Sequence, residues 1–194
     1  MNRRTIFALV IGILLLAFGL ATLIYQNQQA RTGSTAPTQQ RLSTERVGAP
    51  IKGPQDARVT IVEFFDPACE TCRDFQPLLE QLIAQYPGKV RVMVRYAPLH
   101  PGSDQVVMML EAAHRQGQFW PALERLFSQQ HRWTVNHHAD PQKAWQSLML
   151  LNLDQGRLNA DVRDPEVLQV IRQDMSDLDR KSTRLNSSHL VISY

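Results

Sequence analysis

Apolar residues dominate the first part of the chain. After Arg3 and Arg4, the stretch Thr5–Tyr25 contains no charged side chain, and the next charge along the chain is Arg31. A helix rises about 1.5 Å per residue, so about 20 apolar residues are enough to cross a hydrocarbon core of about 30 Å. The pattern predicts one transmembrane helix, with residues 1–25 forming a cytoplasmic stub and a membrane anchor.

A cleaved signal peptide is the alternative explanation of the same stretch. Its apolar part usually has about 7–15 residues and ends in a small-x-small cleavage site, whereas Ile6–Ile24 is longer and no Ala-x-Ala follows it. Arginines that precede a first membrane segment stay on the cytoplasmic side. We therefore expect a single-pass protein of a bacterial inner membrane, whose folded domain faces the periplasm or the cell exterior.

Polar residues replace the apolar ones over residues 26–50. Gln26–Thr44 contains a glycine, a proline and no apolar period, so this stretch has too little hydrophobic surface to form a core. We expect a flexible linker over residues 26–50 and a folded domain over residues 51–179.

Two short apolar runs with a helical pattern between them begin the folded domain. Val59–Phe65 is rich in β-branched and aromatic residues and predicts a buried strand, and Val90–Tyr96 alternates as a second strand. Cys69–Tyr86 has apolar residues at helical spacing, with Pro77 inside it as a predicted kink. A strand–helix–strand unit with a short return predicts two parallel strands and a right-handed crossover.

The second half of the chain is mostly helical in pattern. We expect a helix over Gln105–Gln116, another whose first turn contains Pro121, and further helices that open at Asp140 and Asp164, each followed by proline. Aspartate before proline is typical of an N-cap followed by the first helical position. The last of these helices keeps its apolar period through Asp164–Asp179.

Composition narrows the class of protein. The chain has 194 residues, of which 43% are hydrophobic and 20% charged, and these fractions are typical of a globular protein. The length suits one domain with appendages. The formal net charge of +3 is too small to indicate nucleic-acid binding. Two cysteines are too few for a disulfide-stapled scaffold or a four-thiolate zinc site.

The cysteines occupy the first turn of the helix predicted over Cys69–Tyr86, as Cys69-Glu70-Thr71-Cys72. Backbone N–H groups at a helix N-terminus favour negative charge, which stabilises a thiolate there. The spacing places both sulfur atoms on one side of the helix, within reach of a disulfide. We expect a redox-active disulfide and no other cofactor, with Cys69 as the attacking thiol and Cys72 as the resolving one. Export places the pair in an oxidising compartment.

Other uses of a cysteine pair have less support. A structural disulfide across so short a ring restrains little chain entropy. A c-type haem requires histidine directly after the second cysteine, where this chain has Arg73. No histidine stands at a ligand spacing from the pair, so we expect no resident metal, and we assign no function to His131, His137 or His138. A tethered metallochaperone that holds copper(I) between the two thiolates is the alternative from another class.

Glu63 lies in the middle of the strand predicted over Val59–Phe65, among apolar neighbours. Burying a carboxylate is costly, so two interpretations compete. Either the strand alternation points Glu63 at solvent, or the carboxylate lies beneath the cysteine pair, has a pKa raised by desolvation, and accepts protons. The strand by itself favours neither interpretation.

The segment VEFFDPACETC resembles the active-site segment of the DsbA-type branch of the thioredoxin superfamily. RYAPLHPGSD (Arg95–Asp104) and EAAHRQGQFWPALERLF (Glu111–Phe127) resemble further parts of that family, and the resemblance covers about Val59–Asp179. It implies an α/β thioredoxin-like fold with a helical insertion. It also implies that Glu63, six residues before Cys69, is the family's buried acid and acts as a proton acceptor.

The same resemblance implies a thiol–disulfide oxidoreductase. Its substrates would be cysteines of exported proteins, and a membrane redox partner such as a quinone-linked oxidase would reoxidise it. We expect the oxidase direction, with a periplasmic reductase or isomerase as the alternative. Strong oxidases of the family often have Pro-His between their cysteines, where this chain has Glu70 and Thr71. The extra negative charge beside Cys69 would make the disulfide a weaker oxidant.

The C-terminal residues do not fit the family pattern. After Asp179 the chain changes to Arg180–Tyr194, rich in serine, asparagine and arginine, with no proline after Pro165. The family pattern requires here a strand that begins with a cis proline, then a second strand and a last helix. We therefore expect a C-terminally truncated domain that lacks its last strands and helix, with Arg180–Tyr194 as a non-native tail. Within that tail, Val191-Ile192 could pair as an improvised strand.

Overall fold

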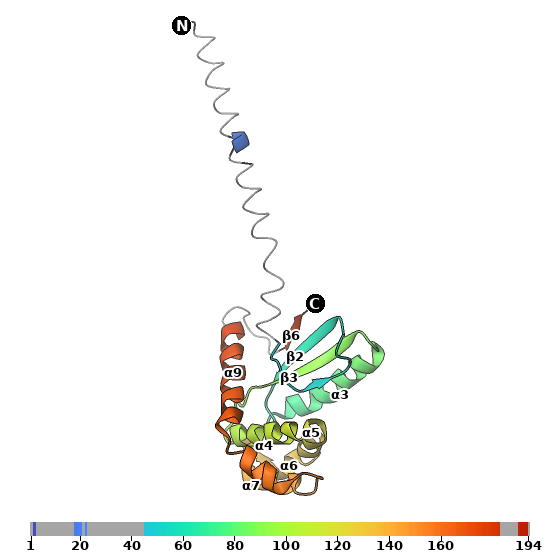
Figure 1. Ribbon diagram of the computed structural model, residues 1–194, viewed down its shortest axis with the longest axis vertical. Helices are drawn as coiled ribbons and strands as arrows, with labels where there is room; N and C mark the ends of the chain where they lie inside the picture. Colours follow the sequence, from blue (N-terminus) through green and yellow to red (C-terminus); the bar gives the residue numbers. More distant parts are fainter. Residues whose placement is uncertain (1, 3–17, 21, 23–44, 183–189, 194) are drawn as a thin grey trace. The chain divides into compact units, whose positions relative to one another are not determined.

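The computed structural model describes residues 2, 18–20, 22, 45–182 and 190–193 (Figure 1). The chain divides into two units, Met1–Ser43 and Thr44–Tyr194. The transmembrane helix predicted over Thr5–Tyr25 lies outside the described residues except at 18–20 and 22, which are helical. Among the described residues, no helix has both the length and the apolar character needed to cross a membrane.

A sheet of four strands forms the centre of the second unit. Its strands are β1 (Ile51–Lys52), β2 (Val59–Phe65), β3 (Val90–Tyr96) and β6 (Leu190–Ser193), in the order β1-β3-β2-β6. The central strands β2 and β3 are parallel along their whole length, from Val59 opposite Val90 to Phe65 opposite Tyr96. Both strands have the bounds that the sequence predicts, and their parallel pairing is confirmed.

The C-terminal tail supplies β6, which pairs antiparallel with β2. The improvised pairing suggested for Val191-Ile192 is confirmed, because both residues belong to this strand. The absence of the family's own last strands and helix stays a prediction. A free strand edge explains the pairing, because its backbone groups can pair with many sequences. Among the described residues the pairing stops where Leu190 faces Glu63, so no strand covers Phe64 and Phe65 on that side.

Helix α3 (Glu70–Gln85) connects β2 to β3 and packs against one face of the sheet. Cys69 is its N-cap residue, and the helix continues through Pro77. Leu79 of this helix is buried in the main core, and Phe75 packs against the same core from the turn before it. The helix predicted over Cys69–Tyr86 is thus confirmed, with the two end residues acting as caps.

Helix α9 (Pro165–Ser182) covers the opposite face of the sheet (Figure 1). Its Leu178 packs with Val62 and Phe64 of β2 in a second, smaller core cluster, whereas Ile61 and Phe65 belong to the main core. Alternate residues of β2 thus enter different clusters, as expected for a strand that is buried on both faces.

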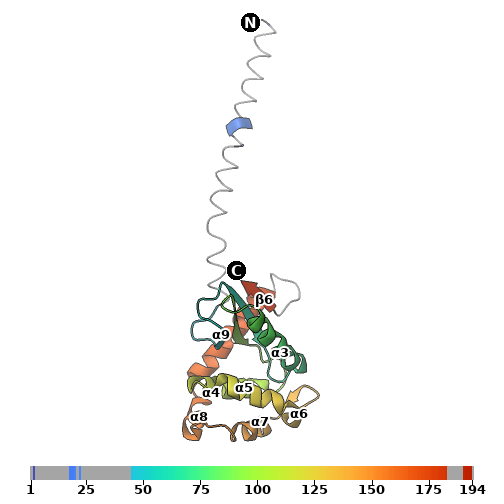
Figure 2. The same ribbon diagram turned by 90° about the vertical axis from the view of Figure 1, so that its right-hand side faces the viewer.

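The helical insertion lies between β3 and α9 and gathers at one end of the sheet (Figure 2). Its elements are α4 (Ser103–Arg115), α5 (Phe119–Ser128), α6 (Gln130–Trp133), β4 (Thr134–Val135), β5 (His138–Ala139), α7 (Pro141–Leu148) and α8 (Gln155–Asp161). Asp140 caps α7, because its carboxylate accepts from the N–H groups of Gln142 and Lys143 at 3.1 Å each. The predicted helical insertion is confirmed. The sequence pattern does not predict α6, α8 or the β4–β5 hairpin, because each is too short to show a hydrophobic period.

Residues 45–50 pack against the domain, although their sequence predicts a linker. Ala49 is buried in the smaller core cluster, and the carbonyl oxygen of Pro50 accepts from Val94 N–H at 2.9 Å. Arg46 donates to the carboxylate of Asp174 in α9 at 2.9 Å. The flexible linker expected over residues 26–50 is therefore wrong at residues 45–50, because a buried ion pair holds residues that show no apolar pattern. Residues 26–44 lie outside the described residues.

Candidate active site

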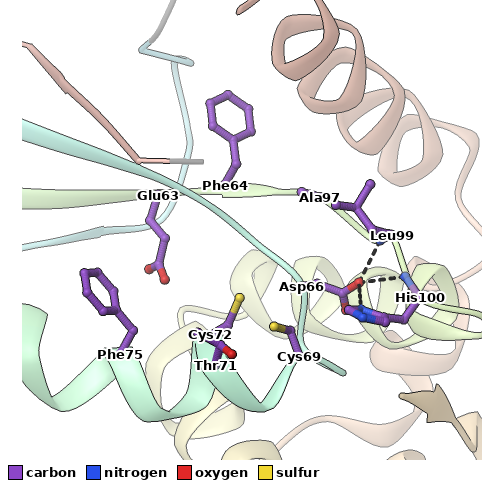
Figure 3. A pocket seen from close by; sticks show the side chains of 10 residues that line it. All are labelled: Glu63, Phe64, Asp66, Cys69, Thr71, Cys72, Phe75, Ala97, Leu99 and His100. Carbon is purple, nitrogen blue, oxygen red and sulfur yellow. Dashed lines mark hydrogen bonds and ion pairs between the residues drawn. The ribbon is translucent and has the colours of Figure 1, made fainter. Parts of the chain in front are cut away.

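Cys69 and Cys72 lie one turn apart at the point where the chain leaves β2 and begins α3. Both are free thiols and both side chains are half-buried. Figure 3 shows the Cys69 sulfur directed toward Cys72. The structure therefore brings together the two thiols that the sequence pairs, at the helix end whose N–H groups favour an anion.

Burial raises the pKa of the Cys72 thiol to about 12. A hydrogen bond from the backbone N–H of Asp66 opposes this increase, whereas the neighbouring Cys69 and the negative charge of Glu63 add to it. Cys72 is thus a neutral thiol near pH 7. It needs a proton acceptor before it can attack, and a proton donor when it leaves a disulfide.

The Glu63 carboxyl is buried on the side of the sheet that faces α3. The residue is 7% exposed, and desolvation raises its pKa from 4.5 to about 7. The interpretation in which strand alternation points Glu63 at solvent is therefore wrong, because β2 is buried on both faces. In Figure 3 the carboxylate and the Cys72 sulfur point toward the same space. A group with this pKa can both take and give a proton at neutral pH.

A cavity of about 480 Å³ joins these groups to solvent. The exposed side chain of Leu99 lies at the cavity, and Phe64 and Phe75 contribute apolar surface to its walls. Its lining residues are Glu63, Phe64, Asp66, Cys69, Thr71, Cys72, Phe75, Ala97, Leu99 and His100. The cavity therefore offers space for a second thiol or disulfide next to the cysteine pair, on a largely apolar surface.

Asp66 holds the loop that follows β3 against the loop that carries the cysteines. Its side chain is buried and accepts from the backbone N–H groups of Leu99 at 2.7 Å and His100 at 2.8 Å, and from His100 Nδ1 at 2.7 Å. Its other oxygen accepts from Ala68 N–H at 2.8 Å. In the sequence, Asp66 appears only as the residue that ends the predicted strand. Its acidic side chain so close to Cys69 is the signal that could have identified it.

Gln130 ties the helical insertion to the same loop. The buried Gln130 amide donates to the carbonyl oxygens of Pro67 at 2.8 Å and Cys69 at 3.1 Å, and its own oxygen accepts from Arg73 at 3.0 Å. These three bonds use both the nitrogen and the oxygen of the Gln130 side chain, and they hold the first turn of α3 in place. The sequence contains no signal for this role, because Gln130 lies about 60 residues away from its partners.

The two residues between the cysteines differ in their surroundings. Thr71 is exposed, whereas the Glu70 carboxylate lies 2.8 Å from His137 Nδ1. The acidic residue that departs from the Pro-His pattern thus has a partner of its own. His137 lies in the turn of the β4–β5 hairpin, and no signal in the sequence points to this contact.

The described part of the chain offers no ready metal site. Within it, no group of three or more histidine, cysteine, aspartate or glutamate side chains is placed to hold a metal ion. The three expected site residues, Cys69, Cys72 and Glu63, all line one cavity. Their arrangement is suited to thiol–disulfide exchange coupled to proton transfer.

Comparison with known proteins places this site in context. A family model described as Thioredoxin matches residues 45–186. A thioredoxin-like oxidoreductase from Silicibacter pomeroyi DSS-3 is similar with a TM-score of 0.65 and 27% identity, over 78% of this chain and 84% of that chain. Alpha-DsbA1 from Wolbachia pipientis shares the fold, with a TM-score of 0.64 and 18% identity over 78% of this chain and 77% of that chain.

Curated relatives are much longer proteins. The Na(+)/H(+) antiporter NhaA of Herminiimonas arsenicoxydans is 32% identical over 126 residues, which make up 65% of this chain and 19% of the antiporter. The chain spans less than a fifth of the length of each curated relative that it matches.

Proposed function

The chain belongs to the thioredoxin family, and from this premise we propose that it is a thiol–disulfide oxidoreductase that forms disulfides in exported proteins. One observation carries the proposal: Cys69 and Cys72 open helix α3 beside the buried Glu63, in a cavity that reaches solvent. The pair supplies exchangeable sulfur atoms, and the carboxyl supplies the proton transfer that Cys72 requires.

The first step begins with the Cys69–Cys72 disulfide. A client thiolate attacks the Cys69 sulfur, so a mixed disulfide forms and the bond between the two cysteines breaks. Cys72 leaves with the electron pair of that bond and takes a proton, because its pKa is raised to about 12. Glu63, with a pKa of about 7, gives this proton through water and regains one from solvent.

The second step releases the client. A second client thiolate attacks the client sulfur of the mixed disulfide, and Cys69 leaves as a thiolate at the N-terminus of α3, where N–H groups stabilise the charge. The client has lost two electrons and gained a disulfide, and the protein now carries two electrons as a dithiol. A membrane redox partner, such as a quinone-linked oxidase, accepts these electrons and restores the disulfide. In the reverse direction, Glu63 would accept the Cys72 proton.

We also propose where the reaction takes place. The charge-free stretch Thr5–Tyr25 follows two arginines, which supports a single-pass anchor in a bacterial inner membrane with the thioredoxin domain in the periplasm or outside the cell. Thiols are oxidised in these compartments, which favours the oxidase direction over a reductase or isomerase.

The reduction potential of the cysteine pair tests the proposed direction. The full chain, in detergent, is equilibrated with glutathione buffers, and alkylated thiols are counted by mass. A midpoint of about −120 to −180 mV supports a disulfide donor, and a midpoint near about −270 mV indicates a reductase instead.

Trapping of clients tests the exchange itself. Cys72→Ser removes the resolving thiol, so we expect mixed disulfides between Cys69 and client proteins to accumulate on non-reducing gels. Cys69→Ser is the matched control and should trap none. If neither variant traps a client and the parent pair does not exchange with glutathione, the proposed activity is refuted.

A further inference from the structure

The tip of the β4–β5 hairpin has an unusual backbone. Val135 pairs with His138, which leaves Asn136 and His137 as a two-residue turn, and their φ angles are 48° and 61°. Turns with positive φ at both central positions favour Asn-Gly, because glycine has no Cβ to clash in the left-handed region. Histidine is thus a strained choice at the second position, and such strain is typical of functional sites.

The side chain at this tip reaches the active-site segment. His137 Nδ1 lies 2.8 Å from Glu70 Oε2, and the His137 ring stacks on the ring of His100 with centroids 5.2 Å apart and planes at 24°. His100 Nδ1 in turn lies 2.7 Å from Asp66 Oδ2, which Figure 3 shows. An ionised carboxylate only accepts hydrogen bonds, so each imidazole donates from Nδ1 to one acid beside the cysteines.

The hairpin is held in place next to the loop that carries His100. The Ala139 N–H donates to the carbonyl oxygen of Pro101 at 2.9 Å. Gly102 has a φ of 80°, and a Cβ at this position would lie 2.6 Å from the Ala139 carbonyl oxygen. The close approach therefore depends on glycine, and it seats the hairpin tip where His137 meets both Glu70 and His100.

We propose that His137 is a positioning residue that raises the reduction potential of the Cys69–Cys72 pair by holding the Glu70 carboxylate. This inference rests on the proposed oxidoreductase function. Glu70 directly follows Cys69, and its negative charge disfavours a thiolate there. The imidazole N–H binds that charge, which stabilises the dithiol form and makes the disulfide a stronger oxidant. The Glu70 and His137 side chains are 44% and 57% exposed, so solvent screening keeps the effect modest.

The decisive variant is His137→Gly, because it removes the imidazole but keeps the conformation of the turn. Glycine suits this turn better than histidine, so the free energy of unfolding should stay the same or rise. The midpoint potential should nevertheless fall, with a threefold to tenfold change in the glutathione equilibrium constant, or about 15–30 mV. A merely structural role for His137 would not move the potential of a stable variant.

Two further variants complete the experiment. His138→Ala is the matched control, because His138 is an exposed neighbour whose Nδ1 contacts the Asn136 carbonyl oxygen, and its midpoint should equal that of the parent. In a Glu70→Gln background the effect of His137→Gly should disappear, since the carboxylate it acts through is gone. His137→Asn, which tolerates a positive φ, serves as a second variant that should also lower the midpoint.

Each outcome decides between the alternatives. An unchanged midpoint in both His137 variants overturns the inference, and so does an equal change in the Glu70→Gln background. If the parent pair exchanges with glutathione and the His137 variants have the same midpoint potential as the parent, only this inference fails. If the parent pair does not exchange at all, the proposed function fails and this inference fails with it.

Discussion

The Glu63 carboxyl lies in a buried part of the fold, where a negative charge is unfavourable. The strand that carries it is buried on both faces, and desolvation raises its pKa from 4.5 to about 7. Its neighbour Cys72 has a pKa raised to about 12 by the same cause. Burial therefore creates a donor and an acceptor whose proton affinities differ in the direction that thiol–disulfide exchange requires.

The raised pKa of Glu63 makes stability depend on pH. Between about pH 4.5 and 7 the folded protein keeps the Glu63 carboxyl protonated, whereas the unfolded chain releases the proton. The contribution of this proton to the free energy of unfolding is therefore fully present below pH 4.5 and is lost as pH rises through 7. Glu63→Gln removes the ionisation. We expect the variant to be more stable than the parent by about 3 kcal/mol at pH 8 and equal to it near pH 4, as measured by urea unfolding of the dithiol form.

The exposed Glu124 gives a matched control for this measurement. Glu124→Gln should change the free energy of unfolding by less than about 0.5 kcal/mol at either pH. A Glu63→Gln variant with the same pH dependence as the parent would show that Glu63 ionises normally.

The same variant should form and resolve mixed disulfides about 100-fold more slowly at pH 7, because it cannot carry the Cys72 proton.

Helix α3 depends on an element far away in the chain for the position of its first turn. Gln130 of α6 reaches the carbonyl oxygens of Pro67 and Cys69 and the side chain of Arg73. Fixing these groups orients the Cys69 sulfur relative to Cys72. The helical insertion thus contributes to the active site through this buried amide as well as through the packing of its core.

Gln130→Leu tests this connection. The substitution keeps most of the volume but leaves the buried Pro67 carbonyl oxygen without this donor, whereas the Cys69 carbonyl oxygen still accepts from the Arg73 backbone N–H. We expect a loss of about 2 kcal/mol in the free energy of unfolding. Gln105→Leu, at an exposed position of α4, is the control and should cost less than about 0.5 kcal/mol. Equal effects of the two changes in chemical denaturation would contradict the assigned role.

The whole domain is joined across its sheet by a buried charge network. Asp174 of α9 accepts from Arg46 at 2.9 Å, from Arg95 of β3 at 2.7 Å and from the backbone N–H of Tyr96 at 2.9 Å. Arg95 also pairs with Asp177 at 2.5 Å. The network fastens residues 45–50 and α9 to the central sheet, so segments from both ends of the domain depend on one carboxylate.

Asp174→Asn tests this network at the scale of the molecule. Removing the charge leaves two buried guanidinium groups without their shared carboxylate, and we expect a loss of about 3–5 kcal/mol in the free energy of unfolding. Asp179→Asn, on the exposed side of the same helix, should cost less than about 0.5 kcal/mol. A loss of under about 1 kcal/mol in Asp174→Asn would mean that apolar packing alone holds α9 in place.

The sequence by itself determined the local order of this protein. The bounds of β2 and β3, the helix between them and the placement of Cys69 and Cys72 at its start all follow from short-range periodicity, and the structure confirms them. The periodicity left Glu63 either buried or at solvent, and only the resemblance to the DsbA-type branch implied a buried acid, with which the 7% exposure agrees. The strands and the helix are readable because residues at a fixed spacing, two in a strand and three or four in a helix, share one face, so the pattern itself carries their geometry.

Only the tertiary structure decided which polar residues complete the site. Asp66, Gln130 and His137 meet their partners across 33 to 67 positions of the chain, and none of them belongs to a periodic pattern. Arg46 likewise lies in a segment that the sequence assigns to a linker. Hydrogen bonds and ion pairs act at one distance and one angle. Their partners are therefore chosen by how the elements pack, and this packing is not written in any local stretch of sequence.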